Sequence, residues 1–317
     1  MTVEMDRRVL AESDWRTRAA AHRRRLDELA GDFLRRRAEG EKHPVLDFLF
    51  TYYGHKPAQL RRWHPGFGIA LAGAHEYTGS RGYHRLDTDD GATGPVVTAD
   101  PRFLRARAET VSYIADLLRA TASRPAQLSC FGLHEWAMVY RSGEVRHAGV
   151  PLRLGAAGTD AVVESMPVRC THFDAFRFFT PPAVARNARR LTRDDQLHTE
   201  QPGCLHANMD LYKWGFKLAP LLCSDLLLDC FALARDAREL DMRASPYDLR
   251  DYGYEPVPIE TPAGRADYVR AQAGLAERAA VLRRRLLDDC ESLLVALDRP
   301  ARFTDSTPAR APNRYHH

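Results

Sequence analysis

The residue types best suited to chemistry lie in one segment, residues 204–217, with the sequence CLHANMDLYKWGFK. If this segment is a helix, His206, Asp210 and Lys213 lie on one face, because residues three and four apart are neighbours on a helix. An imidazole, a carboxylate and an amine are costly to bury together without partners. The spacing therefore predicts a functional helix face, with Trp214 beside Lys213.

Two other segments also place a histidine next to a carboxylate. His134 and Glu135 stand in a nearly apolar stretch, which indicates that both are buried. His172 and Asp174 follow a stretch in which residues 168–173 alternate along the chain. This alternation predicts a strand, on which His172 and Asp174 would share one face. The chain thus carries three such pairs in segments that we expect to be buried.

Three converging pairs would form either a metal site or a set of acid–base groups. Imidazole and carboxylate donors together suit zinc or non-haem iron, which predicts His134, His172 and His206 as ligands of a zinc or iron ion. Without a metal, each carboxylate would orient its histidine for acid–base catalysis. For any single histidine, the alternative is a hydrogen-bonded core residue. The side chains predicted to be catalytic are Glu135, Asp174, Asp210 and Lys213.

A long helix is predicted from residue 224, and residues 241–248 follow its end. On this helix Arg238 is expected to face water. The turn after it is predicted to face a ligand, with Arg243 available for an anion and Tyr247 for a substrate, although a salt-bridged helix end is an equal alternative. The other side chains predicted to contact a substrate are the aromatic residues Tyr52, Trp63, Trp136 and Trp214.

The apolar periodicity predicts a mainly α fold with a minor β component (α+β), as a single helical domain with a few short strands. We expect residues 1–12 to form a flexible N-terminus, residues 13–299 one globular domain, and residues 300–317 a disordered tail. The polar residues 186–200 show no apolar stripe and predict an exposed loop.

Composition restricts the class of protein. The chain has 317 residues, of which 44% are hydrophobic, and no apolar run approaches the roughly 20 residues that cross a bilayer. We therefore expect a cytoplasmic protein without a membrane partner.

The six cysteines show no Cys-x-x-Cys spacing. The net charge of +4 includes arginine clusters that admit a nucleic-acid partner, but interleaved acids favour an ordinary solvated surface.

Several motifs resemble those of an actinobacterial family described as 3-methyladenine DNA glycosylases. The resemblance extends from about residue 15 to about residue 280. The matching segments are HPVLDFLFTYY at 43–53, LRRWHPG at 60–66, FGLHEWAMVY at 131–140, HFDAFRFF at 172–179, LYKW at 211–214 and DMRASPYD at 241–248.

This resemblance implies a DNA-repair hydrolase that cleaves the N-glycosidic bond of an alkylated base, with DNA or a nucleobase-like small molecule as partner. It implies that Glu135 or Asp210 activates water and that an aromatic side chain stacks on the base. The residues alone favour a metal-dependent enzyme of small-molecule or natural-product metabolism. A third possibility is a non-enzymatic ligand-binding protein. The distances between the three histidine–carboxylate pairs should decide whether they share a site.

Overall fold

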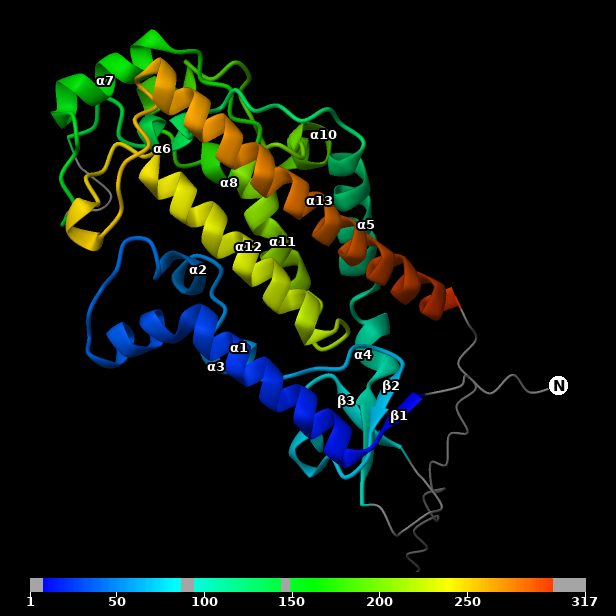
Figure 1. Cartoon of the computed structure of the whole chain (residues 1–317). Coiled ribbons are helices and arrows are strands. Elements are labelled where there is room, and N and C mark those ends of the chain that lie inside the picture. The colour runs from blue at the N-terminus through cyan, green and yellow to red at the C-terminus, as the bar shows by residue number, and fades with distance from the viewer. Residues whose placement is uncertain (1–7, 87–93, 144–148, 299–317) are drawn as a thin grey trace, which may run out of the picture.

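The computed structural model describes residues 8–86, 94–143 and 149–298 (Figure 1). In it, 58% of the residues are helical and 6% lie in strands. The predicted mainly α fold with a minor β component is therefore confirmed. In the described part of the chain, no helix is both long and apolar enough to span a membrane.

Five long helices build most of the structure. The helices α11 and α12 are joined by residues 218–223 and pack side by side, and α13 lies against both α12 and α5 (Figure 1). The first helix, α1, packs on α12 from the other side. The long helices are α1 (Glu12–Ala38), α5 (Ala108–Ala122), α11 (Leu205–Lys217), α12 (Ser224–Arg243) and α13 (Pro262–Asp298).

Short helices connect and cover this assembly. Several of them carry functional side chains at their first turn, as described below. They are α2 (Phe48–Thr51), α3 (Pro57–Leu60), η1 (His75–Tyr77), α4 (Pro101–Arg105), α6 (Leu133–Ala137), α7 (Gly155–Ser165), α8 (Phe173–Phe176), α9 (Pro181–Val184), η2 (Arg193–Asp195), α10 (Gln196–Thr199) and η3 (Arg250–Tyr252).

A small sheet lies at one end of α1 and α12 (Figure 1). Its strand order is β1-β2-β4-β3, with β1 parallel to β2 and the other pairs antiparallel. The first strand corrects our expectation of a flexible segment over residues 1–12, because residues 8–10 pair with β2 and α1 begins at Glu12. Residues 1–7 and the predicted tail 300–317 lie outside the described residues. The strands are β1 (Arg8–Leu10), β2 (Ile69–Leu71), β3 (Tyr83–Leu86) and β4 (Val96–Ala99).

The largest hydrophobic core runs between the long helices and contains nearly all apolar side chains of α11 and α12. A second cluster joins α1 to the sheet and includes Trp15, Trp63 and Tyr77. There, the indole N–H of Trp15 donates to the Ala72 carbonyl at 2.8 Å. Because α11 packs against α12 and α13 and is buried along most of its length, its polar side chains must find partners inside the protein.

Two local predictions are wrong. Residues 168–173 form no strand; Val168 makes only an isolated bridge to Asn187, and His172 instead caps the short helix α8. Alternation of residue types predicts a strand only where a neighbouring strand is present to pair with it. Residues 186–200 are not a plain exposed loop, because they contain η2 and α10 and end at Glu200, which is 2% exposed.

Two glycines of α13 provide a matched test of packing. A Cβ at Gly264 would lie 2.0 Å from the Pro258 carbonyl oxygen, whereas a Cβ at Gly274 would meet no atom within 4 Å. We expect Gly264→Ala to destabilise the protein by about 3 kcal/mol, because backbone atoms must move. Gly274→Ala should stabilise it by roughly 0.5–1 kcal/mol through helix propensity. If urea unfolding gives the two variants equal free energies of unfolding, the close contact between Gly264 and Pro258 would be contradicted.

The burial of His55 predicts that the free energy of unfolding decreases in acid. Its ring is 1% exposed, lies against Phe216, and has Nδ1 2.6 Å from the Tyr212 hydroxyl. Burial lowers the pKa of His55 to about 3. Between pH 6.5 and 3, His55 therefore binds a proton in the unfolded chain but not in the folded chain. The free energy of unfolding is thus unaffected by protonation of His55 above pH 6.5 and decreases as the pH falls below it.

At pH 5 this linkage amounts to about 2 kcal/mol. A His55→Asn variant keeps a side-chain acceptor for Tyr212 but cannot titrate. Urea unfolding at pH 7.5 and pH 5 should therefore show a smaller loss for this variant than for the wild type. Parallel losses in the two proteins would show that His55 does not carry the effect.

Candidate metal centre

The three predicted histidine pairs meet in one buried cluster at the start of α11. The ring of His206, in the first turn of α11, stands edge-on to His134 with centroids 4.5 Å apart. It also stacks on His172 with centroids 5.3 Å apart. His134 comes from α6 and His172 from the start of α8. The three histidine rings, which were predicted to converge, therefore lie next to one another; that they share one site stays a prediction.

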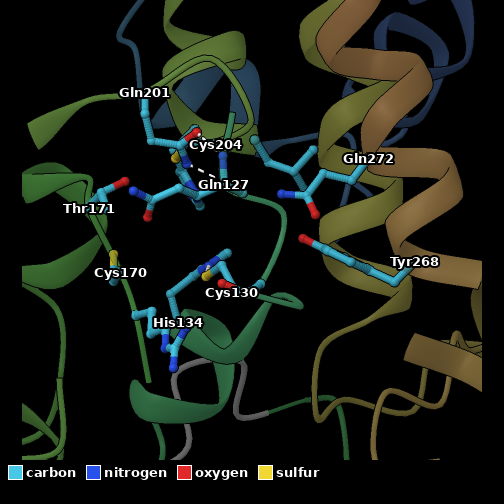
Figure 2. A pocket seen from close by; sticks show the side chains of 13 residues that line it. Gln127, Cys130, His134, Cys170, Thr171, Gln201, Cys204, Tyr268 and Gln272 are labelled. Carbon is cyan, nitrogen blue, oxygen red and sulfur yellow. Dashed lines mark hydrogen bonds between the residues drawn. The ribbon is translucent and has the colours of Figure 1, made fainter. Parts of the chain in front are cut away.

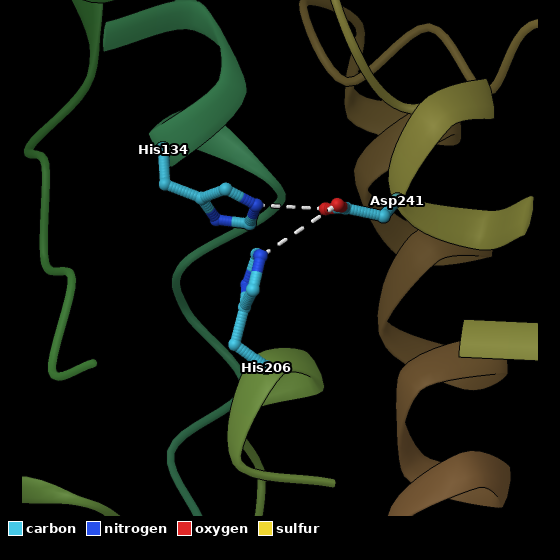
Figure 3. A group of neighbouring side chains, drawn as sticks. All are labelled: His134, His206 and Asp241. Atoms are coloured by element: carbon cyan, nitrogen blue, oxygen red, sulfur yellow. Dashed lines mark hydrogen bonds and ion pairs between the residues drawn. The ribbon is translucent and has the colours of Figure 1, made fainter. Parts of the chain in front are cut away.

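The first group of ligand atoms in the cluster consists of His134, His206 and Asp241 (Figure 3). Both imidazole rings point toward the Asp241 carboxylate. The distance from His134 Nε2 to Asp241 Oδ1 is 2.7 Å, and that from His206 Nε2 to Asp241 Oδ2 is 4.0 Å. The second distance is too long for a hydrogen bond. Among the described residues, no hydrogen bond holds the His206 imidazole.

The environment shifts the pKa values of His134 and His206 in opposite directions. Burial, reinforced by His134, lowers the pKa of His206 well below its ordinary value, so this ring is neutral. Burial also disfavours a charge on His134, but Asp241 outweighs this effect and raises the pKa of His134 well above its ordinary value. A protonated His134 therefore faces an ionised Asp241.

Arg238 holds the carboxylate of this group in place. Its Nη1 donates to Asp241 Oδ2 at 3.0 Å and to Glu135 Oε1 at 2.9 Å. The guanidinium also lies over the ring of Phe48, 4.0 Å from its centroid. Our expectation that Arg238 faces water is wrong, because the residue is 2% exposed. Asp241 likewise lies inside α12 and not in the turn that follows it.

A second group lies on the other side of His206 and consists of His172, Glu200 and Asp210. The distance from His172 Nε2 to Asp210 Oδ2 is 3.2 Å, and that to Glu200 Oε1 is 3.5 Å. Asp210 also accepts from Lys213 Nζ at 2.8 Å and from the Tyr53 hydroxyl at 2.9 Å. The Asp210 carboxylate is thus already held by three donors.

The ring of His172 is oriented as a donor and not as a metal ligand. Its Nδ1 accepts from the backbone N–H of Ala175 at 3.3 Å. A neutral ring in this orientation carries its proton on Nε2, which faces Asp210. A metal on Nε2 would require the proton on Nδ1, where it would meet the N–H of Ala175. The second group is compact enough to hold a cation. The orientation of His172, however, favours a hydrogen-bond network in which its Nε2–H faces Asp210 and Glu200.

Lys213 joins two of the predicted catalytic carboxylates. Its Nζ is 2.8 Å from both Asp174 Oδ2 and Asp210 Oδ2. Burial disfavours a charged Lys213, but Asp210 and Asp174 outweigh it and raise the pKa of the amine. The amine is therefore charged at neutral pH and serves as the cation between these two carboxylates.

A small cavity adjoins the first group (Figure 2). Its volume of about 10 Å³ is enough for about one water molecule. Both His134 and His206 line it, and three cysteines form part of its wall. Burial raises the pKa of Cys204 to about 12, so its side chain is a neutral thiol. The cysteines that line the cavity are Cys130, Cys170 and Cys204.

The predicted substrate-binding residues are dispersed. Trp63 is 2% exposed in the core beside the sheet, and Trp136 is 0% exposed, with its indole N–H donating to Ala244. Tyr247 packs in a third core cluster. Arg243 donates to the Glu255 carbonyl at 2.9 Å. These four residues therefore support the core or a helix end.

Two predicted aromatic residues lie near the cluster. Tyr52 stacks on Phe48 and stands edge-on to Tyr53, whose hydroxyl bonds to Asp210. Trp214 lies beside Lys213, whose Nζ is 4.5 Å from the centroid of the indole ring. The structure thus brings Tyr52 and Trp214 to the side of the cluster that contains Asp210.

Fold and site together define a mainly α-helical protein with a buried centre of two histidines and one carboxylate. Comparisons with protein-family models, with curated proteins and with solved structures found no match for the chain. The function must therefore be inferred from the geometry of the centre.

Proposed function

We propose that the chain is a metal-dependent enzyme in which His134, His206 and Asp241 bind one divalent transition-metal ion, zinc or iron. The observation that carries this proposal is the arrangement of these three buried donors, which come from three separate helices and lie within 4.8 Å of one another. Two imidazoles and one carboxylate are the donor set of many catalytic zinc and non-haem iron(II) sites. Such sites leave positions open for water or substrate.

The charges around the centre also favour a bound cation. Three cations contact the carboxylates of the cluster: Lys213, Arg177 and Arg238. Without an ion, the five carboxylates exceed these cations, and Asp241 raises the pKa of His134, so that a proton on His134 supplies part of the balancing charge that a divalent ion would supply in its place. Burial of uncompensated carboxylates is costly. The five carboxylates are Glu135, Asp174, Glu200, Asp210 and Asp241.

The surroundings suit an ion that acts on a small ligand. The cavity beside His134 and His206 holds about one water-sized molecule, and an ion held by these two histidines and Asp241 would lower the pKa of a water bound to it. Arg238 and Glu135 would orient Asp241, as outer partners of metal ligands do. His172 and Asp210 would provide a neighbouring proton donor and acceptor. A bound ion would supply the activation of a water-sized ligand, and we infer a reaction on a small molecule.

Metal content tests this proposal. Protein that has been stripped with a chelator and reconstituted with zinc, or with iron(II) without oxygen, should retain one ion per chain after desalting. Elemental analysis measures this stoichiometry directly. If neither ion is retained, the proposed function is wrong.

The glycosylase function that the resemblance implies remains a prediction. The geometry weakens it in part, because two of the four aromatic residues predicted to stack on a base, Trp63 and Trp136, are enclosed in the core. Release of 3-methyladenine from methylated DNA tests it, with Glu135→Gln and Asp210→Asn variants as controls. Release by the wild type alone would support a glycosylase in place of the metal-dependent enzyme.

A further inference from the structure

A separate groove of about 560 Å³ lies between α5, α10 and the end of α11. This volume is in the range of roughly 300–1,000 Å³ that is typical of small-molecule sites. The aromatic part of its wall consists of Tyr113 and Trp214, whose ring centroids are 6.0 Å apart with an interplanar angle of 66°. Trp214 is 5% exposed, and the amines of Lys213 and Lys217 lie 4.5 and 5.0 Å from the centroid of its ring, so Tyr113 is the aromatic side chain that a ligand can reach more freely.

Charged side chains of both signs line the same groove. Lys217 and Arg193 are the cations, and Glu109 and Asp194 are the anions. Among the described residues, none of these four side chains forms an ion pair. The groove thus presents two cations and two carboxylates that form no ion pair with one another.

The groove is connected to the buried cluster by hydrogen bonds. The Tyr113 hydroxyl donates to Gln196 Oε1 at 2.7 Å, and Gln196 Nε2 donates to Glu200 Oε1 at 2.6 Å. Glu200 in turn lies 3.5 Å from His172 Nε2. A ligand in the groove would therefore lie one side chain away from the buried carboxylates, and Gln196 would be the contact between them.

We propose that this groove binds a free α-amino acid with an aromatic side chain. The ligand carboxylate would pair with Lys217 and Arg193, and its ammonium group with Glu109 or Asp194. Its ring would pack against Tyr113. A zwitterion uses both signs of charge in the groove, whereas a simple anion or cation would leave one pair unused. The proposal goes beyond the metal-dependent function and does not require a bound ion.

Calorimetric titration of the full chain tests the ligand class. L-Phenylalanine is the probe, and 3-phenylpropanoate and phenethylamine each lack one of its two charges. We expect L-phenylalanine to bind, and each analogue to bind about fivefold more weakly, since an exposed charge contact contributes about 1 kcal/mol. Absence of L-phenylalanine binding, or equal affinity for all three compounds, would overturn the proposal.

Two variants locate the contacts. Lys217→Gln should weaken L-phenylalanine binding about fivefold and leave phenethylamine binding unchanged, because phenethylamine has no carboxylate. Glu109→Gln should weaken L-phenylalanine and leave 3-phenylpropanoate unchanged. Lys42→Gln, on the surface before α2, is the matched control and should bind all three compounds as the wild type does. Wild-type affinities in both groove variants would overturn the assignment of the groove.

Discussion

A His206→Ala variant is expected to lose the bound metal ion while it keeps the fold. His206 supplies a neutral imidazole that no hydrogen bond holds among the described residues, so its removal takes away a ligand and the ring contacts with His134 and His172 but breaks no hydrogen bond. We expect the metal affinity to fall by more than the roughly 10–100-fold that the loss of an outer partner costs. Competition with a chromophoric chelator measures this affinity, and circular dichroism checks the fold.

His172→Asn is the matched control. Asparagine can still cap α8 by accepting from the Ala175 N–H, so this variant should fold. Because His172 faces Asp210 as a donor, we expect the variant to retain the ion with an affinity within about tenfold of the wild type. Loss of the ion from His172→Asn and its retention by His206→Ala would reverse the assignment of the two histidines.

An Arg238→Met variant is expected to be strongly destabilised. Arg238 is the cation shared by the buried Glu135 and Asp241, and its loss leaves two buried carboxylates without this partner. Breaking a buried ion pair in this way costs about 3–5 kcal/mol. Urea unfolding followed by tryptophan fluorescence measures the free energy of unfolding.

Arg235→Met, one turn earlier on α12, provides the comparison. Arg235 pairs with Asp236 at the surface, where its side chain is 39% exposed, so its loss should change stability by less than about 0.5 kcal/mol. A double variant Glu135→Gln/Arg238→Met should recover part of the stability, because one unpaired carboxylate is removed. Equal stabilities of the two arginine variants would show that the buried pairs are not a structural requirement.

The sequence predicts the functional face of α11 because spacing within a helix fixes which side chains are neighbours. His206, Asp210 and Lys213 are three and four residues apart, and the structure places all of them in or beside the cluster. Their burial could also be predicted, since apolar residues surround them in the sequence. The convergence of His134 and His172 on His206 could be stated only as a hypothesis.

The residues that sequence analysis missed are those whose partners are distant in the chain. Arg238 pairs with Glu135, 103 positions away, and a charged residue on a helix is expected to face water when no partner is visible. Asp241 stands one turn later on α12, and the i,i+3 spacing of the two residues was the available signal. Glu200 ends a polar segment, and no local pattern indicates that its side chain turns inward.

The most direct test of the central claim is the position of the metal in a crystal of reconstituted protein, measured by anomalous diffraction at the absorption edge of zinc or iron. We predict a single anomalous peak bounded by His134 Nε2, His206 Nε2 and the Asp241 carboxylate. A peak between His172, Glu200 and Asp210, or no peak at the cluster, would contradict the assignment.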